Sequence, residues 1–302
     1  MSRFRLGLIG FGEVGQIFGV GLRATMEGVS AWDVKFNDEA TRAEALSAAQ
    51  AVGVRLCGSL SELCQNASLI VSAVTASQTL QVATDAARHM APGSVFLDLN
   101  SASPGTKQKA AAMIEAAGGH YLEAAVMTSV PPYGVRVPML LGGPHAERLL
   151  PALQTIGLDV RVVSTQLGVA SATKMCRSVM IKGMEALVIE SFTAARQHGV
   201  EAEVIASLQE TFPAIDWAQQ GRYFFSRVAQ HGRRRAEEMR EAAQTVKEAG
   251  FDPVMATAIA EKHAWMAAHA QAGHFQALGP EPTWQTYADR LIAARGEAAN
   301  DA

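Results

Sequence analysis

Residues 6–15 read LGLIGFGEVG, a short apolar run that leads into Gly10-x-Gly12-x-x-Gly15. A strand followed by this spacing and then by helical sequence is typical of a turn that binds a dinucleotide pyrophosphate. The first glycine allows the turn, the second lets the backbone approach the phosphates, and the third lets helix pack on strand. Glycine is common here (26 of 302 residues), so a turn without a ligand is the alternative. We expect cofactor contacts from Gly10, Phe11, Gly12, Glu13, Val14 and Gly15.

A second predicted strand, VSAWD at 29–33, ends in an acid. Asp33 follows Gly15 by 18 residues, close to the separation of about 20 at which a carboxylate accepts hydrogen bonds from a ribose. That carboxylate would repel a 2′-phosphate, so it favours NAD over NADP. Two alternatives stay open. Asp33 only ends the strand, or the run 34–36 extends the strand and places Asn37 or Asp38 at its tip.

The composition indicates two domains with ample apolar cores: 302 residues are 49% hydrophobic and 18% charged. A net charge of −3 gives no reason to expect nucleic acid or an anionic membrane as a partner. No apolar run reaches the length of a membrane span. The first strand begins within about five residues, which leaves no room for a secretory signal, and the three cysteines form no CxxC pair. We expect reduced thiols, a cytoplasmic location and a small-molecule partner.

Strand and helix signals alternate in the first half of the chain, which predicts a Rossmann-type, doubly wound parallel α/β sheet over 1–164. An all-helical domain follows over 165–302. We expect strands at 5–9, 29–33, 53–57, 68–74, 94–99, 120–126, 138–141 and 159–163, and helices at 13–26, 39–51, 59–65, 77–90 and 103–117. Residues 166–200 form one long helical pattern. We expect later breaks at Gly199, Pro213, Gly232, 250–253 and 279–280.

The stretch GVASATK at 168–174 opens this long helix and ends in Lys174. At about 100° per residue, Lys174 shares a face with Arg177, Ser178 and Glu185. The helix carries few charges, so it should be largely buried, and a lysine there needs a partner or a chemical task. An active-site lysine and a structural ion pair fit the pattern equally well.

Four stretches together resemble the β-hydroxyacid dehydrogenase family, which includes 3-hydroxyisobutyrate and 6-phosphogluconate dehydrogenases. They are GFGEVG with the later WD, LDLNSASP at 97–104, LEAAVMTSVPPYGVRVPMLLGG at 122–143, and GVASATK. The resemblance implies hydride transfer between NAD (NADP is possible) and the carbinol carbon of a small acidic 3-hydroxy acid or sugar acid. Lys174 would be the general acid/base, with Ser178 beside it. It implies further cofactor contacts from Val74, Thr75 and Asn100, and substrate contacts from Ser101, Thr128 and Ser129.

The chain departs from the family pattern where the substrate should bind. Ser178 stands where the family has asparagine, and Met127-Thr128-Ser129 replaces Ser-Gly-Gly. The segment HGRRR at 231–235 offers an anchor for a substrate anion, most clearly through His231 and Arg234. The alternative is a solvated helix with i,i+4 ion pairs to Glu237 and Glu238. These departures indicate a divergent subfamily with a 6-phosphogluconate-dehydrogenase-like helical C-terminal domain, through which we expect a homodimer.

Two other functions remain on the same fold. One is an imine reductase, against which the retained Lys174 argues, and the other is a non-catalytic sensor of NAD(P)H. We predict no metal site. His89, His120 and His145 are scattered in the first domain, and no Asp or Cys joins His263, His269 and His274 at metal spacing.

Overall fold

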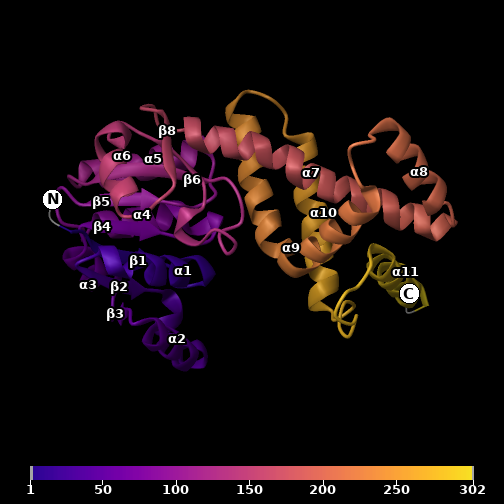
Figure 1. Cartoon of the computed structure of the whole chain (residues 1–302), viewed down its shortest axis with the longest axis horizontal. Helices are drawn as coiled ribbons and strands as arrows, with labels where there is room; N and C mark the ends of the chain where they lie inside the picture. Colours follow the sequence, from indigo (N-terminus) through magenta and orange to yellow (C-terminus); the bar gives the residue numbers. More distant parts are fainter. Residues whose placement is uncertain (1–2, 301–302) are drawn as a thin grey trace. The chain divides into compact units, whose positions relative to one another are not determined.

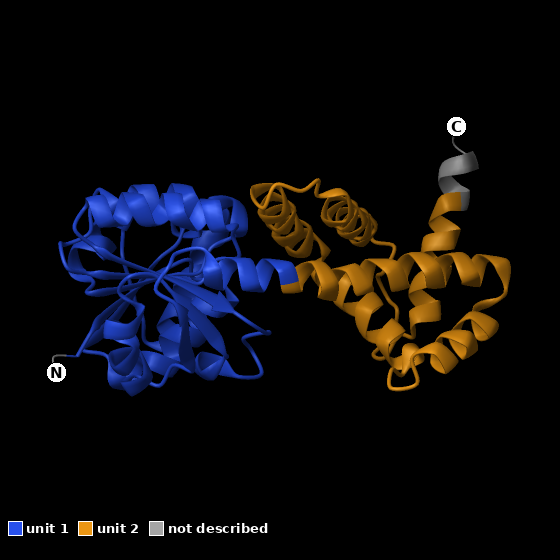
Figure 2. Cartoon of the chain, turned by 90° about the horizontal axis from the view of Figure 1, so that it is seen from above, with its two compact units in different colours: residues 1–176 blue, residues 177–302 orange. Residues whose placement is uncertain are grey.

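A computed structural model describes residues 3–300, with side chains as far as 295. The chain forms two compact units, Met1–Cys176 and Arg177–Ala302, shown in two colours in Figure 2. The division lies inside helix α7 (Val169–His198). The boundary expected after residue 164 coincides with the end of strand β8 (Val160–Ser164), just before this helix begins.

The first unit is built on an eight-stranded sheet in the order β3-β2-β1-β4-β5-β6-β7-β8 (Figure 1). The Rossmann-type prediction is confirmed. Its strands are β1 (Arg5–Ile9), β2 (Gly28–Trp32), β3 (Arg55–Leu56), β4 (Leu69–Ser72), β5 (Val95–Asp98), β6 (His120–Val126), β7 (Met139–Gly142) and β8. The expectation of a wholly parallel sheet is wrong in one place, because β6 and β7 pair antiparallel. Only one short 3₁₀ turn, Gly134–Arg136, separates them, and a parallel crossover normally needs a helix.

Helices cover both faces of the sheet, as its apolar runs require. One face packs against α1 (Glu13–Leu22), α2 (Glu39–Val52) and α6 (Ala146–Thr155). The other packs against α3 (Leu60–Asn66), α4 (Thr79–Ala87) and α5 (Pro104–Ala116). Successive strand residues serve opposite faces: Leu69 and Val71 join the first core, and Ile70 joins the second.

Local capping fixes where several elements begin. Ser103 accepts a hydrogen bond from the Thr106 amide, and Pro104 is the first residue of α5, as the sequence predicts. Residues Val34–Phe36 form a 3₁₀ turn and do not extend β2. Asp33 therefore stands at the tip of β2, and Asp38 instead caps α2. The alternative placement of Asn37 or Asp38 at the strand tip is excluded.

The second unit is helical, as expected. After α7 come α8 (Glu201–Thr211), α9 (Trp217–Glu248), α10 (Val254–Gln271) and α11 (Trp284–Asn300), around a core that includes Phe192, Phe225 and Trp284. The predicted break at Gly232 is wrong, because α9 runs through it. A Cβ on Gly232 would lie 2.8 Å from the His263 carbonyl oxygen. The absence of a side chain at this position therefore allows α10 to pack closely against α9. No described helix is long and apolar enough to cross a membrane.

Candidate active site

The predicted cofactor residues gather at one edge of the sheet. Strands β1, β2, β4 and β5 are parallel, so their carboxyl ends lie at a common edge. The glycine turn, Asp33, the segment 73–75 and Asn100 directly follow these four ends. Because β1 lies between β2 and β4, the strand order reverses at β1. Ligands of open α/β sheets bind at such a switch point.

The glycine turn has the form that a dinucleotide pyrophosphate requires. Gly10 has φ +90°, and a Cβ there would lie 2.5 Å from the Ala73 carbonyl oxygen. A Cβ on Gly12 would meet no described atom within 4 Å, so the space above it is open. Helix α1 begins at Glu13, and no described side chain caps it. Its first amides are thus available to phosphate oxygens, and the residues fit a dinucleotide.

Asp33 is tied directly to this turn. Its Oδ2 accepts a hydrogen bond of 2.7 Å from the Phe11 amide, and its Oδ1 accepts one of 3.0 Å from the Lys35 amide. The side chain is only half-buried. The acid is therefore held at the entrance of the turn, where one face of the carboxylate can still reach a ribose hydroxyl.

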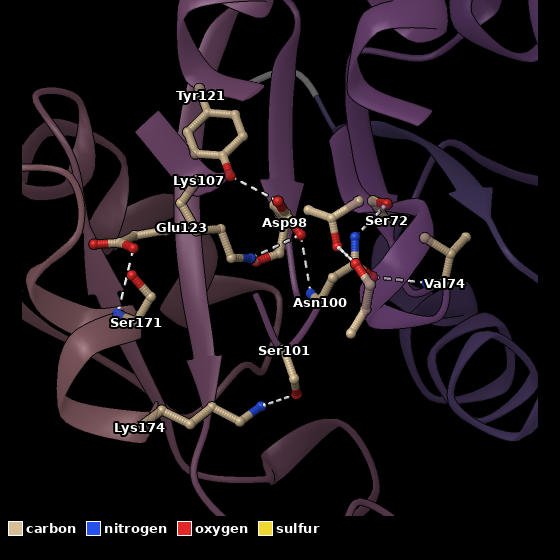
Figure 3. Close-up of polar contacts among 12 residues, drawn as sticks. Ser72, Val74, Asp98, Asn100, Ser101, Lys107, Tyr121, Glu123, Ser171 and Lys174 are labelled. Atoms are coloured by element: carbon tan, nitrogen blue, oxygen red, sulfur yellow. Dashed lines mark hydrogen bonds and ion pairs between the residues drawn. The ribbon is translucent and has the colours of Figure 1, made fainter. Parts of the chain in front are cut away.

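The side chain of Asn100 forms hydrogen bonds through both its amide oxygen and its amide nitrogen (Figure 3). Its Oδ1 accepts a 2.7 Å hydrogen bond from the Val74 amide, and its Nδ2 donates to Ser72 Oγ at 3.0 Å. Val74 is half-buried and Thr75 is exposed. These contacts indicate that Asn100, which is 4% exposed, positions the loop that carries Val74 and Thr75.

A buried ion pair fixes the end of β5 behind Asn100. Lys107 Nζ lies 2.9 Å from Asp98 Oδ1, and the Tyr121 hydroxyl donates to Asp98 Oδ2 at 2.6 Å (Figure 3). Burial, together with the negative charge of Asp98, raises the pKa of Tyr121 well above its ordinary value, so the phenol stays a donor. Asp98 also accepts from the Asn100 amide at 2.9 Å. The network anchors the segment that leads to Ser101.

Lys174 reaches this segment from a distant part of the chain. Its Nζ donates a 2.6 Å hydrogen bond to Ser101 Oγ (Figure 3), although 73 residues separate the two. Lys174 and Ser101 are both half-buried. The fold thus brings a predicted catalytic residue and a predicted substrate residue together at the edge of the sheet that carries the glycine turn.

Glu123 fixes the start of the helix that carries Lys174. Its carboxylate, 1% exposed, accepts hydrogen bonds from the amides of Gly168 (2.8 Å), Ala170 (3.1 Å) and Ser171 (3.3 Å). Negative charge at a helix N-terminus is stabilising because it meets the unpaired amides and the positive end of the helix dipole. Glu123 therefore anchors the start of α7 to the sheet.

The remaining predicted residues lie elsewhere. Thr128 is exposed and Ser129 half-buried in the loop that follows β6. In the second unit Ser178 is buried on α7 and accepts a 3.2 Å hydrogen bond from Lys182 Nζ. His231 is half-buried on α9, where Arg234 Nε lies 3.7 Å from Glu238 Oε1. Their roles toward a substrate stay predictions.

Sequence reasoning missed three buried charged residues of the first unit, Asp98, Lys107 and Glu123. It also missed the buried pair of Arg235 with Glu185 in the second unit. A signal was present, since Asp98 and Glu123 each interrupt an apolar run. A buried charge needs partners, but the sequence does not say which ones.

Comparison with known proteins now adds to this geometry. Residues 5–164 match the NAD binding domain of 6-phosphogluconate dehydrogenase, and residues 195–266 match a domain of unknown function, DUF1932. The chain belongs to the β-hydroxyacid dehydrogenase family. The resemblance drawn from its four motifs is confirmed, and the first unit of this family member is an NAD(P)-binding domain.

Solved structures agree with this assignment. A conserved hypothetical protein from Sinorhizobium meliloti 1021 is 37% identical, with 95% of each chain covered and a TM-score of 0.73. The conserved protein MTH1747, of unknown function and structurally similar to 3-hydroxyacid dehydrogenases, is 32% identical over 89% of this chain and 98% of its own (TM-score 0.66). A Mycobacterium tuberculosis 3-hydroxyisobutyrate dehydrogenase with L-serine shares the fold at 18% identity, with 96% and 99% covered (TM-score 0.70). An imine reductase from Myxococcus stipitatus in complex with NADP+ also shares it, at 17% identity over 95% and 99% (TM-score 0.53).

Proposed function

We propose that this family member is an NAD-dependent dehydrogenase that oxidises the carbinol carbon of a small acidic 3-hydroxy acid or sugar acid. The observation that carries the proposal is the 2.6 Å hydrogen bond from Lys174 Nζ to Ser101 Oγ. It places an amine and a hydroxyl beside each other at the carboxyl edge of the sheet, next to a turn that fits a dinucleotide. Asp33, at the tip of β2, supports NAD over NADP.

The nicotinamide, when bound, accepts the hydride. Side chains of this protein take up and return the proton of the substrate hydroxyl. With Lys174 unprotonated, Nζ takes the proton of the substrate hydroxyl as the hydride leaves its carbon. In the reductive direction, protonated Lys174 returns that proton to the carbonyl oxygen. Ser101 Oγ accepts a hydrogen bond from the amine, so it holds Nζ in place between proton transfers.

Each unit, taken by itself, carries candidates for binding a substrate anion among the residues that differ from the family pattern. Thr128 and Ser129 offer hydroxyl donors in the loop after β6. In the second unit, His231 offers an imidazole and Arg234 a guanidinium, and a guanidinium binds carboxylate or phosphate in a bidentate manner. The 3.7 Å separation of Arg234 from Glu238 leaves this ion pair loose. Neutral substitution of Arg234 should raise KM for an acidic substrate without affecting NAD binding.

Two alternatives make different predictions. An imine reductase is favoured by structural neighbours such as the Myxococcus stipitatus imine reductase, but a dedicated lysine at position 174 favours oxidation of an alcohol. A sensor of NAD(P)H is favoured by the altered Ser178 and 127–129 positions. It would bind reduced cofactor tightly and turn over nothing.

A direct test is a panel of 3-hydroxy acids and phosphorylated sugar acids, each incubated with NAD or NADP, with the absorbance of reduced nicotinamide as the readout.

With an active substrate, Lys174→Ala should lower kcat by about 10²–10⁴-fold and leave NAD affinity nearly unchanged. Lys109→Ala is the matched control, because Lys109 is an exposed lysine on α5 of the same unit. Wild-type turnover in Lys174→Ala would refute the assignment of the base. If no reduced nicotinamide forms with any member of the panel and NADH binds tightly, the sensor is favoured. Consumption of NADH or NADPH in a separate assay with cyclic imines, and no activity on the panel, would favour the imine reductase.

A further inference from the structure

A second cluster of potential ligands lies at the opposite edge of the same sheet. Glu115, His120 and His145 each offer one ligand atom, and the three atoms lie within 4.8 Å of one another. This corrects the expectation that the histidines of the first domain are scattered. Glu115 is in the last turn of α5, His120 opens β6, and His145 is the N-cap of α6. Because β6 begins here and runs parallel to β5, the cluster is at the amino edge, away from the glycine turn.

We propose that Glu115, His120 and His145 form a binding site for a divalent transition-metal ion of the zinc type. Two imidazoles and one carboxylate are a ligand set that zinc accepts, with a fourth position left to water. Zinc holds such ligands at about 2.0–2.2 Å. The His145 Nε2 and Glu115 Oε2 atoms, 3.1 Å apart, are close to the separation that two ligands of one tetrahedral ion require.

The environment of His120 supports this assignment. Its Nδ1 is buried and has no hydrogen-bond partner among the described residues, and a buried polar atom in that state is costly. A bound metal ion would give this buried imidazole nitrogen a partner.

The other two ligands are held but remain accessible. The Glu115 carboxylate accepts a 2.8 Å hydrogen bond from the Tyr121 amide, which fixes it beside the start of β6. The side chains of His145 and Glu115 are 22% and 34% exposed, so an ion and a water molecule can reach them. The two imidazole rings already lie 4.3 Å apart, centroid to centroid.

One residue opposes metal binding. Arg148 Nη2 lies 3.4 Å from His145 Nδ1 and brings a positive charge to the cluster. When Nε2 of His145 binds a metal, Nδ1 carries the proton, so Arg148 must move away. Arg148 is exposed and can do so. Removing its charge should therefore strengthen binding.

The test is calorimetric titration of the metal-free full chain with zinc chloride at pH 7.5, in a buffer that does not chelate. We expect one site per chain in the first unit, lost or weakened at least about 100-fold in His120→Ala and in His145→Ala, and tightened in Arg148→Gln. His89→Ala is the matched control, an exposed histidine of the same unit. His274→Ala controls for the His269–His274 pair, whose Nδ1 atoms lie 2.7 Å apart; both controls should keep the site.

Zinc should also raise the thermal unfolding midpoint of the wild type, because it binds the folded chain, and this rise should be absent in His120→Ala. Far-UV circular dichroism checks that each variant is folded. No heat of binding to the wild type, or equal zinc affinity in wild type and a folded His120→Ala, would overturn the proposal. The test is independent of dehydrogenase activity, so its failure leaves the proposed function untouched.

Discussion

At the scale of single residues, Asp33 shows how one side chain can carry two roles. Its Oδ2 accepts a hydrogen bond from the Phe11 amide of the glycine turn, and under the proposed function its carboxylate also binds the adenosine ribose. The sequence left open whether Asp33, Asn37 or Asp38 ends the strand. The 3₁₀ turn at Val34–Phe36 decides for Asp33.

Asp33→Asn should change cofactor preference and preserve the turn, since an amide oxygen can still accept from Phe11. We expect the ratio of kcat/KM for NAD over NADP to fall at least about tenfold, equivalent to about 1.4 kcal/mol, because the repulsion of a 2′-phosphate is lost. Initial rates with both cofactors measure it. Asp38→Asn is the control, since Asp38 caps α2. An unchanged ratio in Asp33→Asn would show that the acid does not select the cofactor.

At the scale of elements, the site depends on where α7 begins. Three amides at its start donate hydrogen bonds to one buried carboxylate, Glu123, on the interior strand β6. These bonds join the helix to a strand that lies 45–48 residues earlier in the chain. Lys174 follows Ser171 by three residues, so a shift of the helix start would move Nζ away from Ser101.

Glu123→Ala should therefore lower both stability and activity. Leaving buried amides without an acceptor costs about 1–3 kcal/mol for each, so we expect the free energy of unfolding of the first unit to fall by about 3 kcal/mol or more. Urea denaturation measures this loss. Glu147→Ala, at an exposed position on α6, should change stability by less than about 0.5 kcal/mol. Equal stability of the two variants would show that Glu123 does not anchor α7.

At the scale of the whole molecule, buried titratable groups of the second unit couple its stability to pH. His263 is 0% exposed, and burial, followed by the positive charge of Arg235, lowers its pKa to about 3. The ordinary value is about 6.5. Between these two pKa values, His263 binds a proton in the unfolded chain and stays neutral in the folded chain. The free energy of unfolding therefore falls as the pH is lowered.

His263→Leu should remove this dependence. We expect the free energy of unfolding of the wild type to decrease relative to the variant by up to about 1.4 kcal/mol per pH unit below pH 6.5. Burial raises the pKa of Glu185, which acts in the opposite direction: its contribution is present at low pH and lost as the pH rises. Denaturation at pH 7.5, 6.0 and 5.0 gives the slopes, and parallel slopes would contradict the assignment.

We also expect a homodimer formed through the helical unit. Met180 and Leu187 lie seven residues apart on one side of α7 and are 67% and 58% exposed, so this side of the helix offers apolar surface for an interface. Light scattering at micromolar concentration should give twice the chain mass. The double substitution Met180→Glu and Leu187→Glu should shift the protein to monomer. A wild-type monomer at high concentration would refute the dimer.

Sequence by itself determined the features that repeat or act locally. Alternation of apolar residues predicts strands, and the GFGEVG turn with the later Asp33 predicts a dinucleotide site. A capping serine before Pro104 predicts where a helix begins. In each case the physical cause lies within a few residues, in backbone conformation, capping or periodicity. Most element positions therefore followed from sequence, with ends displaced by a few residues.

Tertiary structure decided everything that depends on distant segments meeting. No local pattern predicts that α10 packs closely against Gly232, or that β7 runs antiparallel to β6. Nor does any local pattern predict that the amides at the start of α7 donate hydrogen bonds to Glu123. The same holds for the contact of Lys174 with Ser101 across 73 residues, and for His120 beside His145. Such contacts follow from sheet order and helix packing, which arise from the burial of whole faces and are not encoded at any one position.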